Sequence, residues 1–208
     1  MYLDEYIMEH SDAEPDYLQK ISRRTHLRMV NPRMMSDYVQ GRLLTMFTYM
    51  IKPLRVLELG TYSGYSTLCI AEALPPEGVI HTIEHDDELE DFILDNFSLS
   101  PLSKKIVLHI GDALHEIPKI DETFDLVFID ADKREYPDYY KAVLPKVHSG
   151  GFILVDNTLW DDKVLDKPHS GDKQTKVLIE FNKIIASDNR VEKIILPLRD
   201  GLTVIRKK

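Results

Sequence analysis

Residues Phe124 to Tyr140 read FDLVFIDADKREYPDYY, and this stretch sets the pattern for most of the chain. The apolar run from Leu126 to Ile129 is typical of a strand that is buried on both faces of a sheet. It ends abruptly in the polar sequence DADK, and a helical pattern follows from Pro137. A second apolar run, GFILVDN, ends in the same way. The sequence therefore predicts two buried strands that carry polar side chains at their carboxyl ends.

From residue 55 onward, short runs rich in Val, Ile and Leu alternate with longer amphipathic stretches. The expected strands are RVLELG (55–60), VIHTIEH (79–85), KIVLHIGD (105–112), FDLVFIDA (124–131), GFILVDN (151–157), VEKIILPL (191–198) and LTVIRK (202–207). The expected helices are Tyr65–Leu74, Asp87–Phe97, Ala113–Ile117, Pro137–Val147 and about Lys173–Ala186. This alternation predicts an α/β fold with a doubly wound, Rossmann-like, seven-stranded and mostly parallel sheet. Only RDG separates the last two runs, so the last strand is predicted to be antiparallel to its neighbour.

The first 52 residues differ from the rest and are predicted to form a helical arm, followed by an α/β core over residues 53–208 in one domain. Two stretches have helical spacing, EPDYLQKISRRTHLRM and RMMSDYVQGRLLTMFTYMI, and Asn31-Pro32 separates them. On a helix, the second stretch would bring together Met35, Tyr38, Val39, Arg42, Leu43 and Met46. Two interpretations stay open for this arm: packing in the core or in a dimer, and covering a ligand at the strand ends.

The composition excludes several classes of function. The chain has 208 residues, 43% of them hydrophobic, and a net charge of −9 that gives no basic face for nucleic acid or anionic lipid. Cys69 is the single cysteine, which predicts a reducing compartment. The start, MYLDEYIMEH, does not resemble a signal peptide, and no apolar run reaches the roughly 20 residues of a membrane helix. We therefore expect a cytoplasmic protein that does not contact a membrane.

The first strand ends in VLELGTYSGYS, at the edge where open α/β sheets bind ligands. Gly60 and Gly64 would allow the backbone to turn sharply and to approach a ligand closely. Their spacing is not that of the dinucleotide fingerprint G-x-G-x-x-G, which disfavours a nicotinamide dehydrogenase. Glu58 precedes the loop and would suit a cationic ligand better than a pyrophosphate. Glycines also occur in ligand-free turns, so this pattern alone leaves both interpretations open.

The next two strand ends also carry acidic residues. Glu84 ends the second strand, where a carboxylate can accept hydrogen bonds from both hydroxyls of a ribose. The third strand ends in GDAL, which places Asp112 near an adenine bound at this edge. Three consecutive strand ends therefore favour a nucleoside with a positive charge over a phosphate chain.

The motifs ELGTYSGYS, IEH, GDAL, IDADKREY, GGFILVDNTLW and LPLRDGL, taken together, resemble those of the cation-dependent O-methyltransferases of the catechol and caffeoyl-coenzyme A type. The resemblance extends from about Arg33 to the C-terminus. It implies a methyltransferase fold, S-adenosylmethionine as the cofactor, and methyl transfer to one hydroxyl of a small aromatic vicinal diol. It also implies cofactor contacts from Ser36, Glu58, Gly60, Thr61, Ser66, Glu84, Ala113 and Asp130.

The resemblance assigns Asp130, Asp156 and Asn157 to a divalent metal ion, and their spacing at two strand ends permits it. Mg²⁺ prefers six oxygen ligands, so three from the protein leave room for two hydroxyls of a diol and one water. Mg²⁺ is the expected ion, with Mn²⁺ or Ca²⁺ as alternatives. An Asp at a strand end can also serve as a helix N-cap.

Lys133 follows Asp130 closely and is the expected catalytic side chain beside it. A phenol has a pKa of about 10, so most of it is protonated at neutral pH, and a bound cation lowers that pKa. Lys133 would then accept the proton or stabilise the phenolate electrostatically. A solvated lysine at the start of a helix is the structural alternative.

The substrate contacts are less distinctive than the metal motifs. Trp160 and Asp161 lie where the family places acceptor contacts, but WDDKV replaces the glycine-containing pattern common in relatives. Trp160 would form an aromatic wall for a flat acceptor or pack in the core. Asp200 would face the acceptor or shape the turn, and the turn is favoured.

Two alternative functions remain from the sequence. One is methylation of a hydroxylated uridine in tRNA, which the acidic charge disfavours. The other is a non-catalytic module that binds S-adenosylmethionine, which the set Asp130, Lys133, Asp156 and Asn157 disfavours. Relatives are commonly dimers and the N-terminal helices are rich in Met, so a homodimer is expected.

Overall fold

A seven-stranded sheet forms the centre of the computed structural model, which describes residues 3–208. Its strand order is β3-β2-β1-β4-β5-β7-β6. The strands are β1 (Arg55–Leu59), β2 (Val79–Glu84), β3 (Ile106–Ile110), β4 (Phe124–Ile129), β5 (Val147–Val155), β6 (Val191–Leu196) and β7 (Leu202–Lys207). Strands β1 to β5 pair in parallel, and β7 is antiparallel to both of its neighbours. The predicted fold class and the antiparallel last strand are confirmed.

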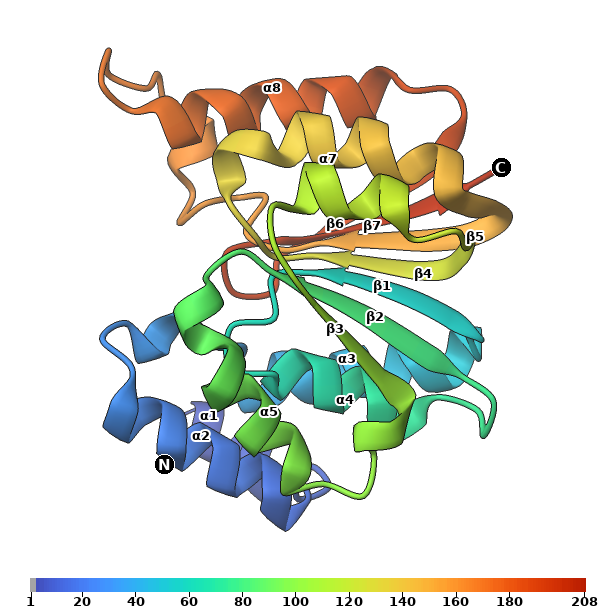
Figure 1. Cartoon of the computed structure of the whole chain (residues 1–208). Coiled ribbons are helices and arrows are strands. Elements are labelled where there is room, and N and C mark those ends of the chain that lie inside the picture. The colour runs from blue at the N-terminus through green and yellow to red at the C-terminus, as the bar shows by residue number, and fades with distance from the viewer. Residues whose placement is uncertain (1–2) are drawn as a thin grey trace.

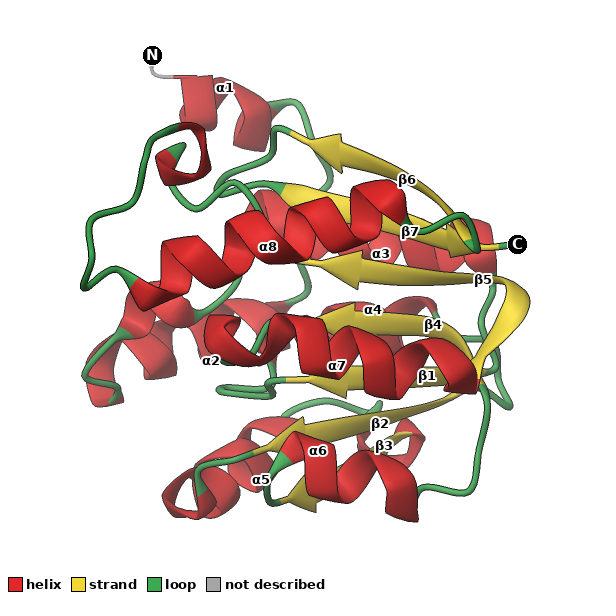
Figure 2. Cartoon of the chain, turned by 90° about the horizontal axis from the view of Figure 1, so that it is seen from above, coloured by secondary structure: helices red, strands yellow, loops and turns green. Residues whose placement is uncertain are grey.

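Helices cover both faces of this sheet (Figures 1 and 2). Helices α6, α7 and α8 lie on one face, and α3, α4 and α5 lie on the other. The helices are α1 (Leu3–Glu9), α2 (Asp16–Arg28), α3 (Tyr38–Ile51), α4 (Tyr65–Ala73), α5 (Glu90–Ser98), α6 (Ala113–Glu116), α7 (Tyr136–Val143) and α8 (Lys173–Ser187). Short 3-10 segments lie at Pro32–Met34, Asp87–Leu89, Ser103–Lys105, Ile117–Lys119, Lys133–Glu135, Leu144–Lys146 and Lys163–Leu165.

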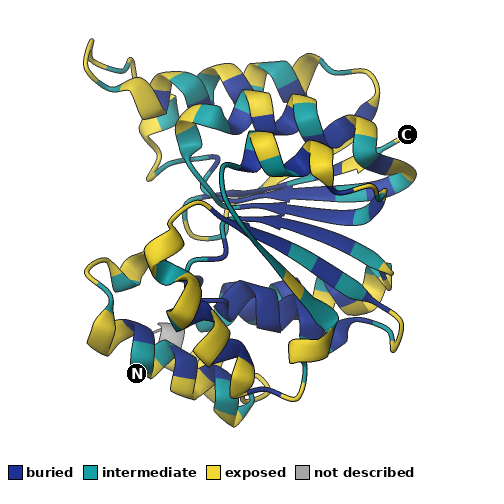
Figure 3. Ribbon diagram, viewed as in Figure 1, coloured by how far each residue is buried: buried dark blue, intermediate teal, exposed yellow. Residues whose placement is uncertain are grey.

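The central strands are apolar because both of their faces are covered. Val127, Phe128 and Ile129 of β4 are fully buried, and alternate residues enter the two core layers above and below the sheet. Figure 3 shows this burial as a dark band through the middle of the sheet. The strand ends are thereby held by two packed layers, so side chains just beyond them have a rigid support.

The α7–β5 boundary differs from the prediction. The expected helix Pro137–Val147 ends at Val143, a 3-10 turn follows, and β5 already begins at Val147. The sequence predicts a strand that begins at Gly151, but Gly150 and Gly151 both lie within β5. Gly150 has a φ of +87°, and β5 is irregularly paired with β4 in this region, so the glycines mark an irregularity inside a strand.

The N-terminal arm packs against α4 and α5. Leu18 and Ile21 of α2 share an apolar cluster with Tyr65 and Leu68 of α4. Helix α3 buries a face that the apolar pattern does not mark, made of Gln40, Gly41, Leu44, Thr45 and Thr48. The reason is close helix packing, since a Cβ at Gly41 would lie 2.8 Å from the Tyr65 ring. Within residues 3–208, no helix has the length and apolarity required to cross a bilayer.

Candidate active site

The carboxyl ends of β1, β4 and β5 lie side by side. Leu59, Ile129 and Val155 are register partners, so the next residues, Gly60, Asp130 and Asp156, share one edge of the sheet. The Asp130 amide donates to the Leu59 carbonyl at 2.9 Å, and the Asp156 amide donates to the Ile129 carbonyl at 3.0 Å. These bonds extend the parallel ladder by one residue and fix where both aspartates leave the sheet.

The two loop glycines are required by neighbouring protein atoms. Gly60 has a φ of +96°, and a Cβ there would lie 2.0 Å from the Asp130 carbonyl oxygen. Gly64 has a φ of +77°, and its Cβ would lie 2.4 Å from the Phe97 ring. The loop is therefore pressed against β4 on one side and α5 on the other, which fixes its backbone before any ligand binds.

Glu58 lies beneath this loop and is completely buried. Its carboxylate accepts hydrogen bonds from the hydroxyls of Ser66, at 2.7 Å, Thr82, at 2.6 Å, and Thr67. The Thr61 hydroxyl in turn contacts that of Thr82 at 2.6 Å. Of the expected cofactor contacts, Glu58, Thr61 and Ser66 thus join one buried network that braces the loop from below.

This network makes folding stability sensitive to pH. Burial raises the pKa of Glu58 from 4.5 to about 7, against the opposing effect of the three hydroxyl donors. Between these two values the folded protein keeps the proton and the unfolded chain has lost it. The free energy of unfolding should therefore fall as pH rises through that window, by up to about 3 kcal/mol for this group. In Glu58→Gln this contribution should be missing.

Urea unfolding of both proteins with EDTA, from pH 4.5 to 8, measures the difference. Glu88→Gln, at an exposed carboxylate, is the matched control and should follow the wild type. Equal pH slopes for wild type and Glu58→Gln would show that Glu58 does not carry a raised pKa.

Glu84 lies at the end of β2 and faces the glycine loop. It is 8% exposed, and its two oxygens accept the backbone N–H groups of Tyr62, at 2.7 Å, and Asp86, at 2.9 Å. Each carboxylate oxygen keeps a further lone pair for a ligand hydroxyl. Tyr62 also donates its hydroxyl to the Asn31 carbonyl at 2.9 Å, which ties the loop to the N-terminal arm.

Three other expected cofactor residues surround this region. Asp112 is the N-cap of α6, where its carboxylate accepts the His115 amide at 3.2 Å, and Ala113 is buried beside it. Ser36 is buried just before Asp37, the N-cap of α3. The sequence left open that an aspartate at a strand end serves as a helix N-cap. Asp112 has this role after β3.

Lys133 and the two strand-end aspartates form a charged cluster. The Lys133 ammonium lies 2.8 Å from the Asp130 carboxylate, and both side chains are largely shielded from solvent. Tyr136 anchors the start of α7 by donating its hydroxyl to the Asp156 carbonyl at 3.1 Å. Burial alone would lower the pKa of Lys133, but Tyr136 and Asp130 outweigh it and raise that pKa. Lys133 is therefore an ion-paired ammonium in this structure.

At Asp156, by contrast, the surroundings disfavour the charged form of the side chain. Burial, and after it the charge of Asp130, raise the pKa of the Asp156 carboxyl, so its ionised form is held at a cost. The Gln40 side chain and the Asn157 backbone oppose this rise. Two carboxyl groups at neighbouring strand ends thus share one ammonium.

Asn157 is oriented by Asp200 of the β6–β7 turn. Its side-chain nitrogen donates to the Asp200 carboxylate at 3.5 Å, and its backbone has a φ of +57°. Because a carboxylate only accepts, this contact points the amide nitrogen at Asp200 and leaves Oδ1 available. The Asp200 carbonyl also accepts the amides of Leu159, at 2.7 Å, and Trp160, at 3.0 Å. Asp200 therefore shapes the turn and also contacts the cluster.

The remaining expected substrate residues lie toward the surface and the α7–α8 layer. Trp160 packs against the core cluster of that layer, and the Lys163 ammonium lies 5.7 Å from the centre of its ring. Asp161 is highly exposed and lies 3.8 Å from the Lys163 ammonium. The structure gives Trp160 a packing role and does not bring Asp161 into contact with the charged cluster.

Gln40, Tyr62, Tyr136 and Arg199 also belong to this region and were not identified from the sequence. The only signal for Gln40 was its D-x-x-Q spacing from Asp37, which is typical of a helix capping box. A capping box satisfies helix ends and does not by itself indicate a site.

Comparisons with known proteins show the family and the fold of this chain. The sequence profile described as O-methyltransferase matches residues 8–208. Caffeoyl-CoA O-methyltransferase of Petroselinum crispum is 34% identical over 219 aligned positions, which cover 99% of this chain and 90% of that protein. Caffeoyl-CoA O-methyltransferase 1 of Arabidopsis thaliana is 32% identical over 218 positions, with 99% and 84% covered.

Solved structures of O-methyltransferases have the same fold as this chain. The O-methyltransferase of Bacillus cereus, solved in complex with SAH, has a TM-score of 0.93 at 26% identity, covering 99% of this chain and 97% of that one. The O-methyltransferase TomG of Streptomyces achromogenes, solved in complex with SAM, has a TM-score of 0.91 at 27% identity, covering 99% and 96%. With a family profile that matches nearly the whole chain, over a fold shared with these enzymes, this protein belongs to the O-methyltransferase family.

Proposed function

We propose that this enzyme transfers the methyl group of S-adenosylmethionine to one hydroxyl of a small aromatic vicinal diol, with the help of a divalent cation. The observation that carries the proposal is the cluster of Asp130, Asp156 and Asn157 beside Lys133, at the edge that the glycine loop also reaches. The loop supplies a cofactor site and the cluster supplies an acceptor site, so donor and acceptor would meet between them.

The first three strand ends fit the cofactor. Glu84 keeps lone pairs for ribose hydroxyls, and Gly60 allows the loop backbone to run close to β4. Asp112 and Ala113 would border the adenine at the end of β3. Glu58 would act from beneath by holding the loop through Ser66 and Thr67 rather than by touching the cofactor.

The charged cluster fits a hard cation. Burial, and after it the charge of Asp130, raises the pKa of the Asp156 carboxyl, and a cation between the two carboxylates would relieve their repulsion. Asn157 adds a free amide oxygen. Asp130, Asp156 and Asn157 offer oxygen ligands and include no His or Cys, so this set favours Mg²⁺, with Mn²⁺ or Ca²⁺ as alternatives, over zinc.

A divalent cation held there would act as a Lewis acid and lower the pKa of an acceptor hydroxyl, so that this hydroxyl would lose its proton to solvent water. The ion-paired Lys133 ammonium would stabilise the resulting phenolate electrostatically. It would act as a base only after losing its own proton, which its raised pKa disfavours. In the transfer, the carbon–sulfur bond breaks with its electron pair left on sulfur, a carbon–oxygen bond forms, and the charges of sulfonium and phenolate cancel.

Calorimetric titration of 3,4-dihydroxybenzoate into protein saturated with S-adenosylhomocysteine tests this proposal. We expect binding with Mg²⁺ and none with EDTA. Binding of equal affinity in both conditions would show that the cation takes no part in binding the acceptor. Absence of binding in both would contradict a small diol as the acceptor and would favour a larger one, with tRNA as the first to test.

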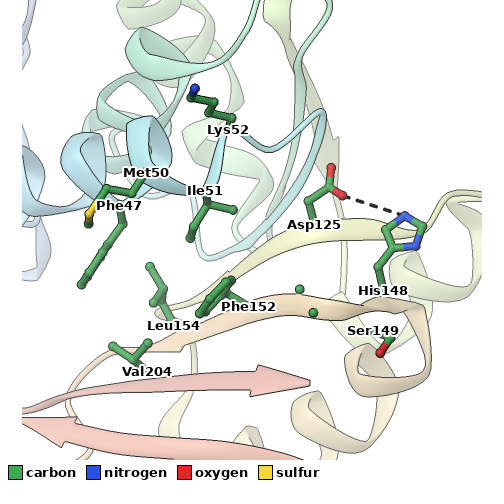
Figure 4. Close-up of a pocket in the computed structure, with 12 residues that line it drawn as sticks. Phe47, Met50, Ile51, Lys52, Asp125, His148, Ser149, Phe152, Leu154 and Val204 are labelled. Carbon is green, nitrogen blue, oxygen red and sulfur yellow. Dashed lines mark ion pairs between the residues drawn. The ribbon is translucent and has the colours of Figure 1, made fainter. Parts of the chain in front are cut away.

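We further propose that the enzyme is a homodimer through an apolar surface between α3 and β6. A hollow of about 560 Å³ lies between α3 and the strands β5 and β7, and it extends to the amino ends of β4 and β5. Figure 4 shows its apolar floor, where Phe47, Met50 and Ile51 face Leu154, Phe152 and Val204, and its polar end, with Asp125 near His148. Val204 pairs with Ile194 of the edge strand β6, and Met50 and Ile194 are 67% and 59% exposed. A second copy of the chain would cover this continuous surface.

Light scattering at micromolar concentration should give twice the chain mass of 24.1 kDa. Met50→Asp should give the monomer mass, because it would bury a charge in the interface. Leu27→Asp, at an exposed apolar position of α2, is the control and should remain dimeric. A monomeric wild type would contradict the proposal.

A further inference from the structure

Three residues from two distant parts of the chain form a closed ring next to Asp156. Asp37 caps α3 by accepting the Gln40 amide on Oδ1 at 2.9 Å. Its other oxygen, Oδ2, lies 3.3 Å from the Arg199 Nε atom in the β6–β7 turn. Arg199 then donates from Nη1 to the Gln40 side-chain oxygen at 2.6 Å. The ring joins the N-terminal arm to the turn that carries Asp200.

The ring determines which way the Gln40 carboxamide points. A guanidinium has only donors, so Arg199 must face the carboxamide oxygen. The nitrogen, Nε2, is therefore turned away from Arg199. Gln40 is 1% exposed, and its Nε2 is buried without a hydrogen-bond acceptor among residues 3–208.

The ring lies beside the strand end that carries Asp156, because Arg199 directly precedes Asp200, whose carboxylate contacts Asn157, the residue after Asp156. The Gln40 side chain is close enough to oppose the rise in the pKa of the Asp156 carboxyl, although no hydrogen bond of ordinary geometry joins the two groups. A buried amide donor without a partner is costly, about 1–3 kcal/mol, and such groups are rare in folded proteins unless they serve a function. The buried carboxylate of Asp156, at the strand end beside the ring, is an acceptor that this donor could serve.

We propose that Gln40 is a positioning residue, which donates from Nε2 to Asp156 when the cation is bound and so orients this carboxylate toward the ion. Carboxylates that hold metal ions are generally hydrogen-bonded by outer groups that fix their orientation. Arg199 and Asp37 act one step further out by holding the Gln40 carboxamide in the required orientation. The inference rests on the proposed cation site.

The ring also couples two segments to that site. Ser36 directly precedes Asp37, and Asp200, which contacts Asn157, directly follows Arg199. Movement of the N-terminal arm or of the turn would therefore change the orientation of Asp156 through Gln40. Asp156 would be oriented by Gln40, which Arg199 holds, and Asn157 would be oriented by Asp200. Arg199 and Asp200 are neighbours in the same turn.

Binding of Mn²⁺, followed by electron paramagnetic resonance in protein saturated with S-adenosylhomocysteine, tests the inference without any turnover. Gln40→Met has similar length and no donor, and we expect its Mn²⁺ dissociation constant to rise about 10–100-fold. The affinity for S-adenosylhomocysteine should stay within about twofold of wild type, because outer groups of this kind act on the ion that they orient.

Two further variants separate positioning from simple packing. Arg199→Met leaves Gln40 in place but frees its carboxamide to rotate, so it should weaken Mn²⁺ binding in the same direction. The double variant of Gln40→Met and Arg199→Met should bind Mn²⁺ no more weakly than Gln40→Met alone, because both changes remove the same function. Thr48→Val is the control for helix α3, since its buried hydroxyl bonds only to the Leu44 carbonyl in the same helix. It should change stability and leave Mn²⁺ affinity unaltered.

Mn²⁺ affinity of Gln40→Met within twofold of wild type would overturn the role of Gln40 and leave the cation site intact. Fully additive losses in the double variant would overturn the orienting role of Arg199. Absence of Mn²⁺ binding in the wild type would overturn the cation site itself, and this inference with it.

Discussion

Asp156→Ala is expected to lower kcat/KM for methyl transfer to a vicinal diol by about a thousandfold, because activation of an acceptor oxygen by a bound cation contributes several kcal/mol. Asp156 is 4% exposed and lies at the end of β5 beside Asp130. Removing it takes away a carboxylate from the cluster that also contains Asn157. Added Mg²⁺ should no longer stimulate the variant.

The measurement is initial rate against Mg²⁺ concentration, together with the affinity for S-adenosylhomocysteine, which should be unchanged. Asp138→Ala is the matched control, because Asp138 is an exposed carboxylate that pairs with Lys141 at the surface of α7. It should retain wild-type activity and its Mg²⁺ dependence. Full Mg²⁺-stimulated activity in Asp156→Ala would exclude this residue from the cation site.

Lys133→Met is expected to lower kcat by about a hundredfold or more, which is the usual loss when a charge that stabilises the reacting oxygen is removed. The Lys133 ammonium is paired with Asp130 at 2.8 Å and its pKa is raised by Tyr136 and Asp130 against the effect of burial. We therefore expect the charge, and not proton uptake, to be what the reaction needs. KM for S-adenosylmethionine should change little.

Lys133→Arg distinguishes the two roles. Arginine keeps the positive charge but cannot lose its proton in the working pH range. Activity of Lys133→Arg at least tenfold above that of Lys133→Met would support electrostatic stabilisation. Equal loss in both variants, with cofactor affinity intact, would instead assign Lys133 the role of general base. Lys141→Met, at an exposed lysine of α7, should behave as wild type.

Much of the fold could be predicted because its physical signals are local. The runs Leu126–Ile129 of β4 and Phe152–Val155 of β5 are continuously apolar, and the parallel connections follow from the helices between the strands. The short RDG turn correctly indicated an antiparallel hairpin, but it did not tell whether β6 or β7 would lie next to β5. That choice depends on contacts between β7 and β5, such as Leu154 with Val204, which are distant in sequence.

The site was predictable in part for the same reason. Asp130, Asp156 and Asn157 follow apolar runs, so their common edge follows from the sheet alone. The surroundings of Glu58 could not be predicted, because three hydroxyl donors from α4 and β2 converge on it only in the folded protein. Its acidity suggested a ligand contact, whereas the structure gives it a place beneath the loop.

The contact between Gln40 and Arg199 could not be predicted from the sequence. The two residues are 159 positions apart in the chain, yet their side chains are joined at 2.6 Å. Neither residue type is distinctive on a helix or in a turn, so no local pattern indicates the contact. Only the fold brings the N-terminal arm beside the β6–β7 turn.

The most direct test of the cation site is a crystal structure with Mn²⁺ and S-adenosylhomocysteine, in which anomalous scattering locates the metal without assumptions about activity. We predict a single strong peak within bonding distance of oxygens from Asp130, Asp156 and Asn157. A structure with well-ordered S-adenosylhomocysteine but no anomalous peak at these three residues would contradict the account.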